Sequence, residues 1–240
     1  TGEQLAWANA LDANGNTILP TSWNTNTGGA GGAYSVTHVY PVASESAAFS
    51  INFASTGNQY RSTLWRSNTA SGENDTVTWT QLNMSSTADP NDKSILDNRR
   101  IDFAACDGVT KHVFVAQNQN GVESQGCTEI HYYDASQGLD DITLSEATVP
   151  ACTDIRKPYY AYSLSKWFVG CDQGVLVSSD GAATWTLAAT TFDGSQKSIY
   201  SVACSSSGTL IAVGGDGTDG FIFRSTDGGQ TWVGDPYLED

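Results

Sequence analysis

The chain has 240 residues, of which 15% are charged, and its 11 Lys and Arg against 26 Asp and Glu give a net charge of −15. A field of this sign repels nucleic acid and anionic membranes, so neither is expected as a partner. No apolar run approaches the roughly 20 residues that span a bilayer, so no membrane insertion is expected. Seven Trp and ten Tyr favour an all-β domain with very little helix, because aromatic residues suit a pleated, half-buried surface.

Five segments share the pattern of an apolar strand, a polar turn and a short strand containing Thr or Trp. In chain order they span residues 5–23, 64–82, 130–144, 175–187 and 221–233. Pairs of apolar strands joined by Ser/Gly turns lie between them, as in 101–117 and 199–217, where Cys106 matches Cys204. Intervals of about 40 to 65 residues are typical of propeller blades. The sequence therefore predicts one domain, residues 1–240, folded as a β-propeller of four-stranded antiparallel blades, five in number.

Two of these hairpins carry nearly the same turn, SSDGAATW at 178–185 and STDGGQTW at 225–232. The shared pattern Ser-x-Asp-x-Gly-x-Thr-Trp resembles the Asp-box of BNR-repeat proteins, a superfamily of β-propellers that includes sialidases, xyloglucan-cleaving glycosidases and sortilin-type receptors. The first copy has Ala182 where that family has Gly.

A turn carboxylate can accept backbone N–H groups, and an indole can pack under the hairpin. The box is therefore expected to be structural rather than a calcium or catalytic site. Its residues are Ser178, Asp180, Gly181, Thr184 and Trp185 in the first copy and Ser225, Asp227, Gly229, Thr231 and Trp232 in the second.

The resemblance to propellers implies a ligand site at the face formed by the loops that lead into the first and third strands of each blade. Aligning the units on Cys106 and Cys204 places five cations just ahead of first strands: Arg99, Arg100, Arg156, Lys157 and Lys197. Arginine grips carboxylates and sulfates in bidentate fashion, and nearby tyrosines can stack on a sugar ring. Those tyrosines are Tyr159, Tyr160 and Tyr200.

A competing interpretation is that these cations balance the local acids and that the tyrosines pack inside the channel. The acids concerned are Asp97, Asp102 and Asp154. Both interpretations stay open at the level of sequence.

Catalysis is not indicated by the residue pattern. Only Asp102 lies convincingly on a first strand, whereas a glycosidase uses at least two carboxylates. No Gly-x-Ser-x-Gly elbow, phosphate loop or Cys-x-x-Cys occurs, and the three histidines are scattered, so no cofactor or metal is expected. The expected function is a binding module for glycans, acidic ones included, or for a partner protein. A sialidase-like glycoside hydrolase is the alternative, and an assembly scaffold within a larger complex comes third.

Five cysteines and two glycosylation sequons, at Asn74 and Asn83, point to a secreted or cell-surface glycoprotein. A chain that starts at Thr1 is consistent with a mature form whose leader has been removed. The blade alignment places three cysteines at the ligand face and predicts one disulfide, Cys152–Cys171 or Cys127–Cys152. The remaining cysteines, Cys106 and Cys204, are expected to be free buried thiols at the opposite face.

Overall fold

The computed structural model describes residues 35–42, 47–56, 59–67, 79–82, 84–86, 96–97, 99–118, 126–137, 142–192, 194–215 and 219–234. These residues form β-strands and one short 3-10 helix, η3 (Ala135–Gln137), and contain no α-helix. None of them belongs to a helix that could span a lipid bilayer. The predicted hairpin at 5–23 and the sequons at Asn74 and Asn83 lie outside the described residues.

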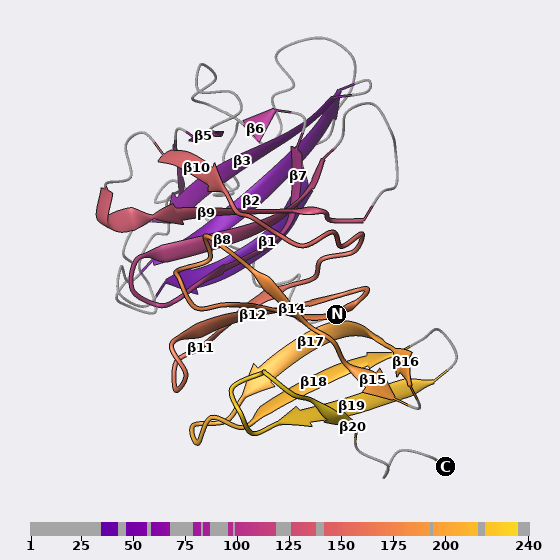
Figure 1. Cartoon of the computed structure of the whole chain (residues 1–240). Coiled ribbons are helices and arrows are strands. Elements are labelled where there is room, and N and C mark those ends of the chain that lie inside the picture. The colour runs from indigo at the N-terminus through magenta and orange to yellow at the C-terminus, as the bar shows by residue number, and fades with distance from the viewer. Residues whose placement is uncertain are drawn as a thin grey trace, which may run out of the picture.

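Four antiparallel sheets, each with four consecutive strands, follow one another along the chain (Figure 1). Sheet I contains β1 (Ser35–Val42), β2 (Ala47–Thr56), β3 (Gln59–Ser67) and β4 (Trp79–Leu82). Sheet II contains β7 (Arg99–Cys106), β8 (Lys111–Asn118), β9 (Glu129–Asp134) and β10 (Ile142–Glu146). Sheet III contains β11 (Pro158–Ala161), β12 (Lys166–Cys171), β13 (Gly174–Ser178) and β14 (Thr186–Ala188). Sheet IV contains β17 (Ser198–Cys204), β18 (Leu210–Gly215), β19 (Gly220–Ser225) and β20 (Val233–Gly234).

This architecture confirms the all-β class and the four-stranded antiparallel sheets predicted from the sequence. Pairs β3–β4, β9–β10, β13–β14 and β19–β20 overlap the four predicted hairpin segments in the described part of the chain, with bounds that differ by up to five residues. Among the described residues there are four such sheets, and the fifth predicted hairpin lies in the part of the chain that is not described. Five blades therefore stays a prediction.

Short additional strands, which the sequence pattern did not predict, extend the regular sheets. Strand β6 (Leu96–Asp97) pairs with β3, and β5 (Met84–Ser86) pairs in parallel with β10 at the outer edge of sheet II. Strands β15 (Thr191–Phe192) and β16 (Ser195–Gln196) form a two-stranded hairpin between sheets III and IV.

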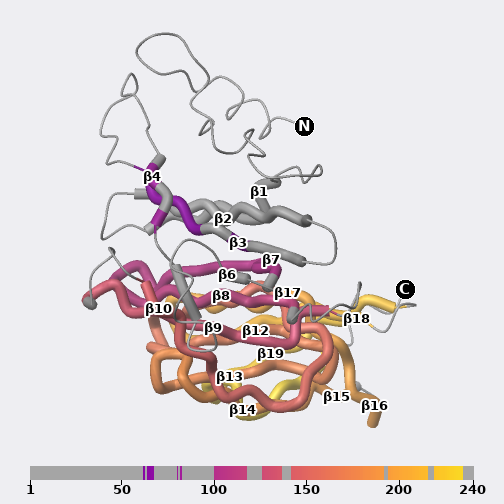
Figure 2. Tube along the Cα trace, turned by 90° about the horizontal axis from the view of Figure 1, so that it is seen from above, coloured from indigo at the N-terminus to yellow at the C-terminus, as the bar shows by residue number. Residues whose placement is uncertain are grey.

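The hydrophobic core lies between consecutive sheets, because strands of the middle sheets bury both faces. On β8, Phe114 packs toward sheet I while its neighbour Val113 packs toward sheet III. On β12, Trp167 packs toward sheet II and Phe168 toward sheet IV. Successive side chains of a strand point to opposite faces, so continuous apolar runs suit sheets covered on both sides. Figure 2 shows β8 of sheet II and β12 of sheet III in neighbouring layers, and Figure 1 places sheets I and IV at opposite ends of the molecule.

Candidate functional site

The two turns that resemble Asp-boxes, 178–185 and 225–232, are called the box turns, and they have nearly the same hydrogen-bond network. In sheet IV the Asp227 carboxylate accepts bonds from Ser225 Oγ at 2.8 Å, Thr231 N at 3.0 Å and Thr231 Oγ1 at 2.5 Å. In sheet III the Asp180 carboxylate accepts the matching bonds from Ser178 Oγ at 2.9 Å, Thr184 N at 3.0 Å and Thr184 Oγ1 at 2.5 Å. Each carboxylate is thus occupied inside its own turn.

The tryptophan of each box turn hydrogen-bonds to the backbone of that turn. Trp232 Nε1 donates to the carbonyl oxygen of Gly229 at 3.1 Å, and Trp185 Nε1 donates to that of Ala182 at 3.0 Å. Both indoles are buried in the core between sheets. Each of these side-chain hydrogen bonds therefore lies within its own turn.

The hydrogen bonds also shift the titration of the two carboxyl groups. Those from the hydroxyl and backbone of Thr231 hold the pKa of Asp227 well below its usual value. Partial burial acts to raise the pKa of Asp180, but the bonds from Thr184 and Ser178 outweigh it and lower that pKa as well.

The loop face is the end of sheets II to IV where the first strands β7, β11 and β17 begin. Backbone bonds tie its segments together: Ile155 N donates to Cys127 O at 2.7 Å, and Arg156 N donates to Gly170 O at 2.9 Å. Lys197 N donates to Thr190 O at 2.9 Å within sheet III's connection to sheet IV. The segment before β11 therefore meets both the segment before β9 and the end of β12 at this face.

Arg100 is paired with an acid on its own strand. Its Nε lies 2.6 Å from Asp102 Oδ1, and the other carboxylate oxygen accepts Gln117 Nε2 at 2.6 Å and contacts Cys127 Sγ at 3.5 Å. Burial, with the negative charge of Asp102 next, raises the pKa of the Cys127 thiol well above its usual value. Cys127 is therefore a neutral thiol and a poor nucleophile.

Arg156 lies half-buried on the loop face, at the boundary between sheets III and IV. Its guanidinium pairs with Asp154 and lies 5.2 Å from the centre of the Tyr200 ring, so it bridges sheets III and IV. The Tyr200 side chain is 47% exposed. An exposed aromatic ring beside a paired donor and acceptor can hold a sugar, with its apolar face on the ring and its hydroxyls on the charged groups.

Several residues predicted for this face are held elsewhere. Tyr159 bonds through its hydroxyl to the backbone of Cys204 at the far end, and Tyr160 packs against Trp167 with ring centres 5.0 Å apart. Lys197 is only 8% exposed, and its Nζ lies 4.4 Å from the centre of the Phe221 ring. Lys157 is exposed, and the side chain of Arg99 lies outside the described part of the structure.

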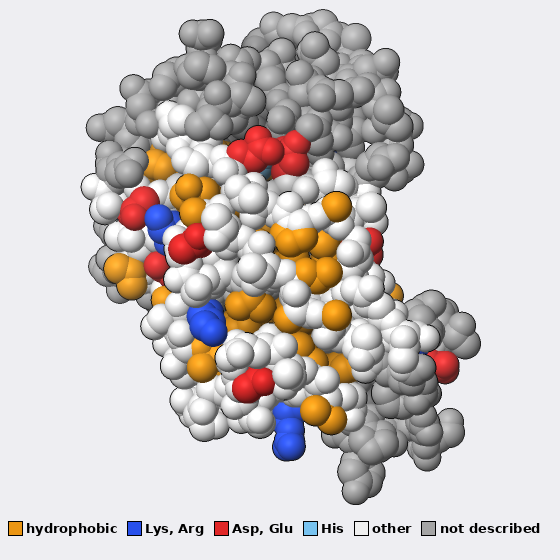
Figure 3. Space-filling model, viewed as in Figure 1, with side chains coloured by type: hydrophobic (Ala, Val, Ile, Leu, Met, Phe, Trp, Pro, Cys, Tyr) orange, Lys and Arg blue, Asp and Glu red, His pale blue; other side chains and the backbone are white. Residues whose placement is uncertain are grey.

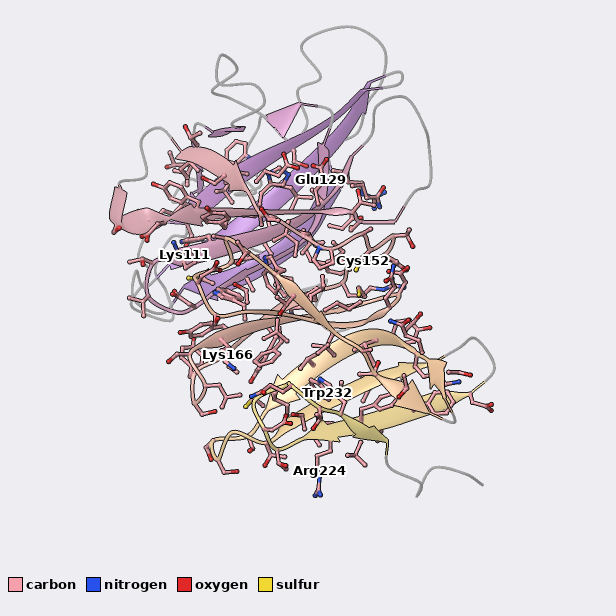
Figure 4. The ribbon with its side chains drawn as sticks, viewed as in Figure 1. Lys111, Glu129, Cys152, Lys166, Arg224 and Trp232 are labelled. Carbon is pink, nitrogen blue, oxygen red and sulfur yellow. The ribbon has the colours of Figure 1, made fainter. Side chains whose placement is uncertain are left out.

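Three cysteines share the core between sheets II and III, and two of them touch. Cys152 Sγ lies 3.2 Å from Cys171 Sγ, where the loop before β11 meets the end of β12 (Figure 4). No disulfide joins any of the five cysteines, all of which lie in the described residues. The hydrogen bond from Cys152 lowers the pKa of the Cys171 thiol below its usual value.

Cys152, Cys171 and Asp172 are also the one group in the described part of the chain whose three ligand atoms lie within 4.8 Å of one another. Both Asp172 oxygens, however, accept bonds from Thr153, at 3.0 and 2.7 Å. Two thiolates on one tetrahedral zinc lie about 3.8 Å apart, farther than these two sulfurs. The geometry therefore suits a sulfur–sulfur bond better than a zinc ion.

No family model and no curated protein sequence matches this chain. Among solved structures it is similar to an ancestral GH74 enzyme, a glycoside hydrolase, with a TM-score of 0.52 and 13% sequence identity. The match covers 88% of this chain and 32% of the enzyme, so the chain spans about a third of that protein's length. The likeness and the succession of four-stranded antiparallel sheets support a propeller-type fold.

Sequence reasoning missed one feature of the loop face, the position of Asp154. Asp154 is brought beside the segment before β9, where a β-carbon on Gly126 would lie 3.0 Å from Asp154 Oδ1. Asp102 and Asp154 therefore flank the same short segment, 126–127, although Asp102 lies on β7 and Asp154 in the loop before β11. The sequence holds no signal for this, because it depends on how sheets II and III pack together.

Proposed function

We propose that the protein is a glycan-binding module whose ligand occupies the loop face around Arg156 and Tyr200. The observation that carries the proposal is the exposed Tyr200 ring in contact with the Arg156 guanidinium, which is itself held by Asp154. The three side chains offer a stacking surface, a hydrogen-bond donor and an acceptor within one patch. Carbohydrate rings present the complementary set of C–H faces and hydroxyl groups.

The charges of this face favour sugar hydroxyls over an isolated anionic group. Arg100 and Arg156 each have a carboxylate partner, so neither presents a full, uncompensated positive charge. Paired charges still donate and accept hydrogen bonds through their outer atoms. An acidic glycan would need to displace Asp154 from Arg156, whereas a neutral one would not.

A glycan array probed with the purified protein tests this proposal. We expect retention of a defined set of sugars, and loss of that retention in Arg156→Ala. The Lys166→Ala variant, which removes a cation far from the loop face, is the matched control and should keep the same array pattern. Retention of no glycan would contradict the proposal. It would favour a partner protein as the ligand, with the chain acting as a scaffold in a larger assembly.

A glycoside hydrolase is the second candidate, because Asp102 and Asp154 flank one segment. Glycosidases use two carboxyl groups on either side of the scissile bond, about 5 to 10 Å apart. We expect binding without turnover, since each carboxylate is tied to an arginine. Incubating any retained glycan with the protein and analysing the products distinguishes the two: cleavage that is lost in both Asp102→Asn and Asp154→Asn would establish the enzyme.

The proposal places the protein outside the cell or at its surface. The sequons at Asn74 and Asn83 and the neighbouring Cys152 and Cys171 sulfurs support this location. Mass analysis of the protein from its native source would show glycans on those asparagines, and unmodified asparagines would argue against it.

A further inference from the structure

A groove of about 310 Å³ lies on the side of the molecule between sheets III and IV, away from the loop face. Its walls come from β12, β13 and β14 of sheet III and from the box turn of sheet IV. They include Lys166, Val177, Thr186, Leu187, Gly228 and Gln230. In Figure 3 hydrophobic side chains gather on this side of the molecule, and Figure 4 labels Lys166 and Trp232 on the two neighbouring sheets. The volume falls at the lower end of the range for sites that hold small molecules, about 300–1,000 Å³.

The equivalent position between sheets II and III contains an aromatic ring. Strand register makes Tyr132 the counterpart of Val177: Tyr132 pairs with Val113 and Ser145, and Val177 pairs with Phe168 and Thr186. Tyr132 packs into the core between sheets II and III, as Val177 packs into the core between sheets III and IV. The two sites are thus copies of one structural position.

The lysines beside the two positions also correspond. Lys111 is the first residue of β8, and Lys166 is the first residue of β12. Lys111 lies beside Gly181 in the box turn of sheet III, and Lys166 lies beside Gly228 in the box turn of sheet IV. A β-carbon on Gly181 would lie 3.3 Å from Lys111 Cε, and Lys166 Nζ lies 3.4 Å from Gly228 O. Lys111 Nζ lies 5.5 Å from the centre of the Tyr132 ring. The position between sheets III and IV thus has the same lysine and glycine as the position between sheets II and III. It has the smaller Val177 where the other position has the ring of Tyr132.

We propose that this groove is a binding site for an aromatic side chain of a partner protein, which takes the place that Tyr132 fills in the neighbouring copy. Leu187 and Val177 supply apolar walls, and Lys166 supplies the cation for the ring face. Gln230 and Thr186 at the rim can bond the hydroxyl of a tyrosine. The described lining contains no aromatic residue on which a sugar could stack, so this site differs in chemistry from the loop face.

Titration with N-acetyl-L-tyrosinamide, followed by amide chemical shifts, tests the site on the full chain. We expect saturable shifts at Gly228, Gly229 and Gln230, and no saturable shifts with N-acetyl-L-leucinamide at the same concentrations. In the Val177→Tyr variant the new tyrosine ring should itself occupy the groove, as Tyr132 does in the neighbouring copy. The added compound should then no longer bind, and the chemical shifts should no longer change. Equal binding of the leucine compound, or binding that survives in Val177→Tyr, would overturn the proposal.

A second variant covers the case in which Val177→Tyr fails to fold. Lys166→Met keeps most of the side-chain stem but removes the charge, and it should weaken tyrosinamide binding at least about threefold. Unchanged affinity in Lys166→Met would contradict the role of the cation. Glycan retention at the loop face should be the same in both variants, so failure of one proposal is separable from failure of the other.

Discussion

Arg156 and Tyr200 lie in contact across the boundary between sheets III and IV, with the guanidinium 5.2 Å from the centre of the ring. Arg156 precedes β11 and Tyr200 lies in β17, so the contact forms only because two first strands begin at the same end of the molecule. Asp154 fixes the arginine from the other side. The ring remains about half exposed, so the pair presents an open surface rather than a closed packing contact.

The lowered pKa values of the box-turn carboxyl groups and of Asp134 predict that the fold is sensitive to acid. The pKa values of Asp180 and Asp227 are lowered in the folded state, and that of Asp134 is lowered to about 2 by hydrogen bonds from Ser136 and the charge of Lys111. A carboxyl group with a depressed folded pKa contributes stability above its unfolded pKa of about 4, and loses it as pH falls through the folded value. The melting temperature should therefore drop progressively below about pH 4.

Asparagine variants check the origin of that drop. Asp180→Asn and Asp227→Asn should melt at a lower temperature than the native protein at pH 7, and should show a shallower fall between pH 4 and 2. Parallel curves for native protein and variants would show that other carboxyl groups cause the acid sensitivity.

Gly229 and Ala182 occupy the same position in the two box turns, and opposite substitutions there should have unequal effects. Gly229 has a φ of 86°, and a β-carbon there would lie 2.6 Å from Phe168 Cε1, so Gly229→Ala should cost about 1–3 kcal/mol of unfolding free energy. Ala182 already accommodates its methyl group at a φ of 74°. In Ala182→Gly, relief of backbone strain and the gain in unfolded-state entropy oppose each other, so the change should stay below about 1 kcal/mol. Urea denaturation measures both, and equal effects would contradict the packing difference.

The Cys152 and Cys171 sulfurs should form a disulfide when the protein is oxidised by a disulfide such as oxidised glutathione. The bond would clamp the loop before β11 to the end of β12, and closing a loop of this size stabilises a protein by about 3 kcal/mol. Alkylation in denaturant without reduction, followed by peptide mass analysis, should label Cys106, Cys127 and Cys204 only. A bond between Cys106 and Cys204 would contradict both the pairing and the blade alignment.

The strand pattern was readable in the sequence because it depends on local signals. The turns at 178–185 and 225–232 set the phase of the sheets, and matching Cys106 with Cys204 located the first strands β7 and β17. The side-chain partners were not readable, since they depend on how whole sheets pack. Nothing near Lys197 in the sequence indicates that Phe221 lies beneath its ammonium group, nor near Tyr159 that its hydroxyl reaches Cys204.

The same limit explains why the groove was missed. Tyr132 and Val177 are both ordinary strand residues, and only the paired registers show that they occupy copies of one position. The competing interpretation of the cations, as partners of local acids, also depends on distances that a sequence does not contain. The structure pairs Arg100 with Asp102 and Arg156 with Asp154.

The most direct test of the central claim is the affinity of a glycan retained on the array for the native protein, Tyr200→Ala and Tyr162→Ala. Tyr162 is a matched control, because it is 66% exposed but lies in the turn after β11, at the end opposite the loop face. We predict a loss of about tenfold or more in Tyr200→Ala, as expected for a central aromatic contact, and native affinity in Tyr162→Ala, with both variants folded by circular dichroism. Native affinity in Tyr200→Ala would contradict a glycan site at the loop face.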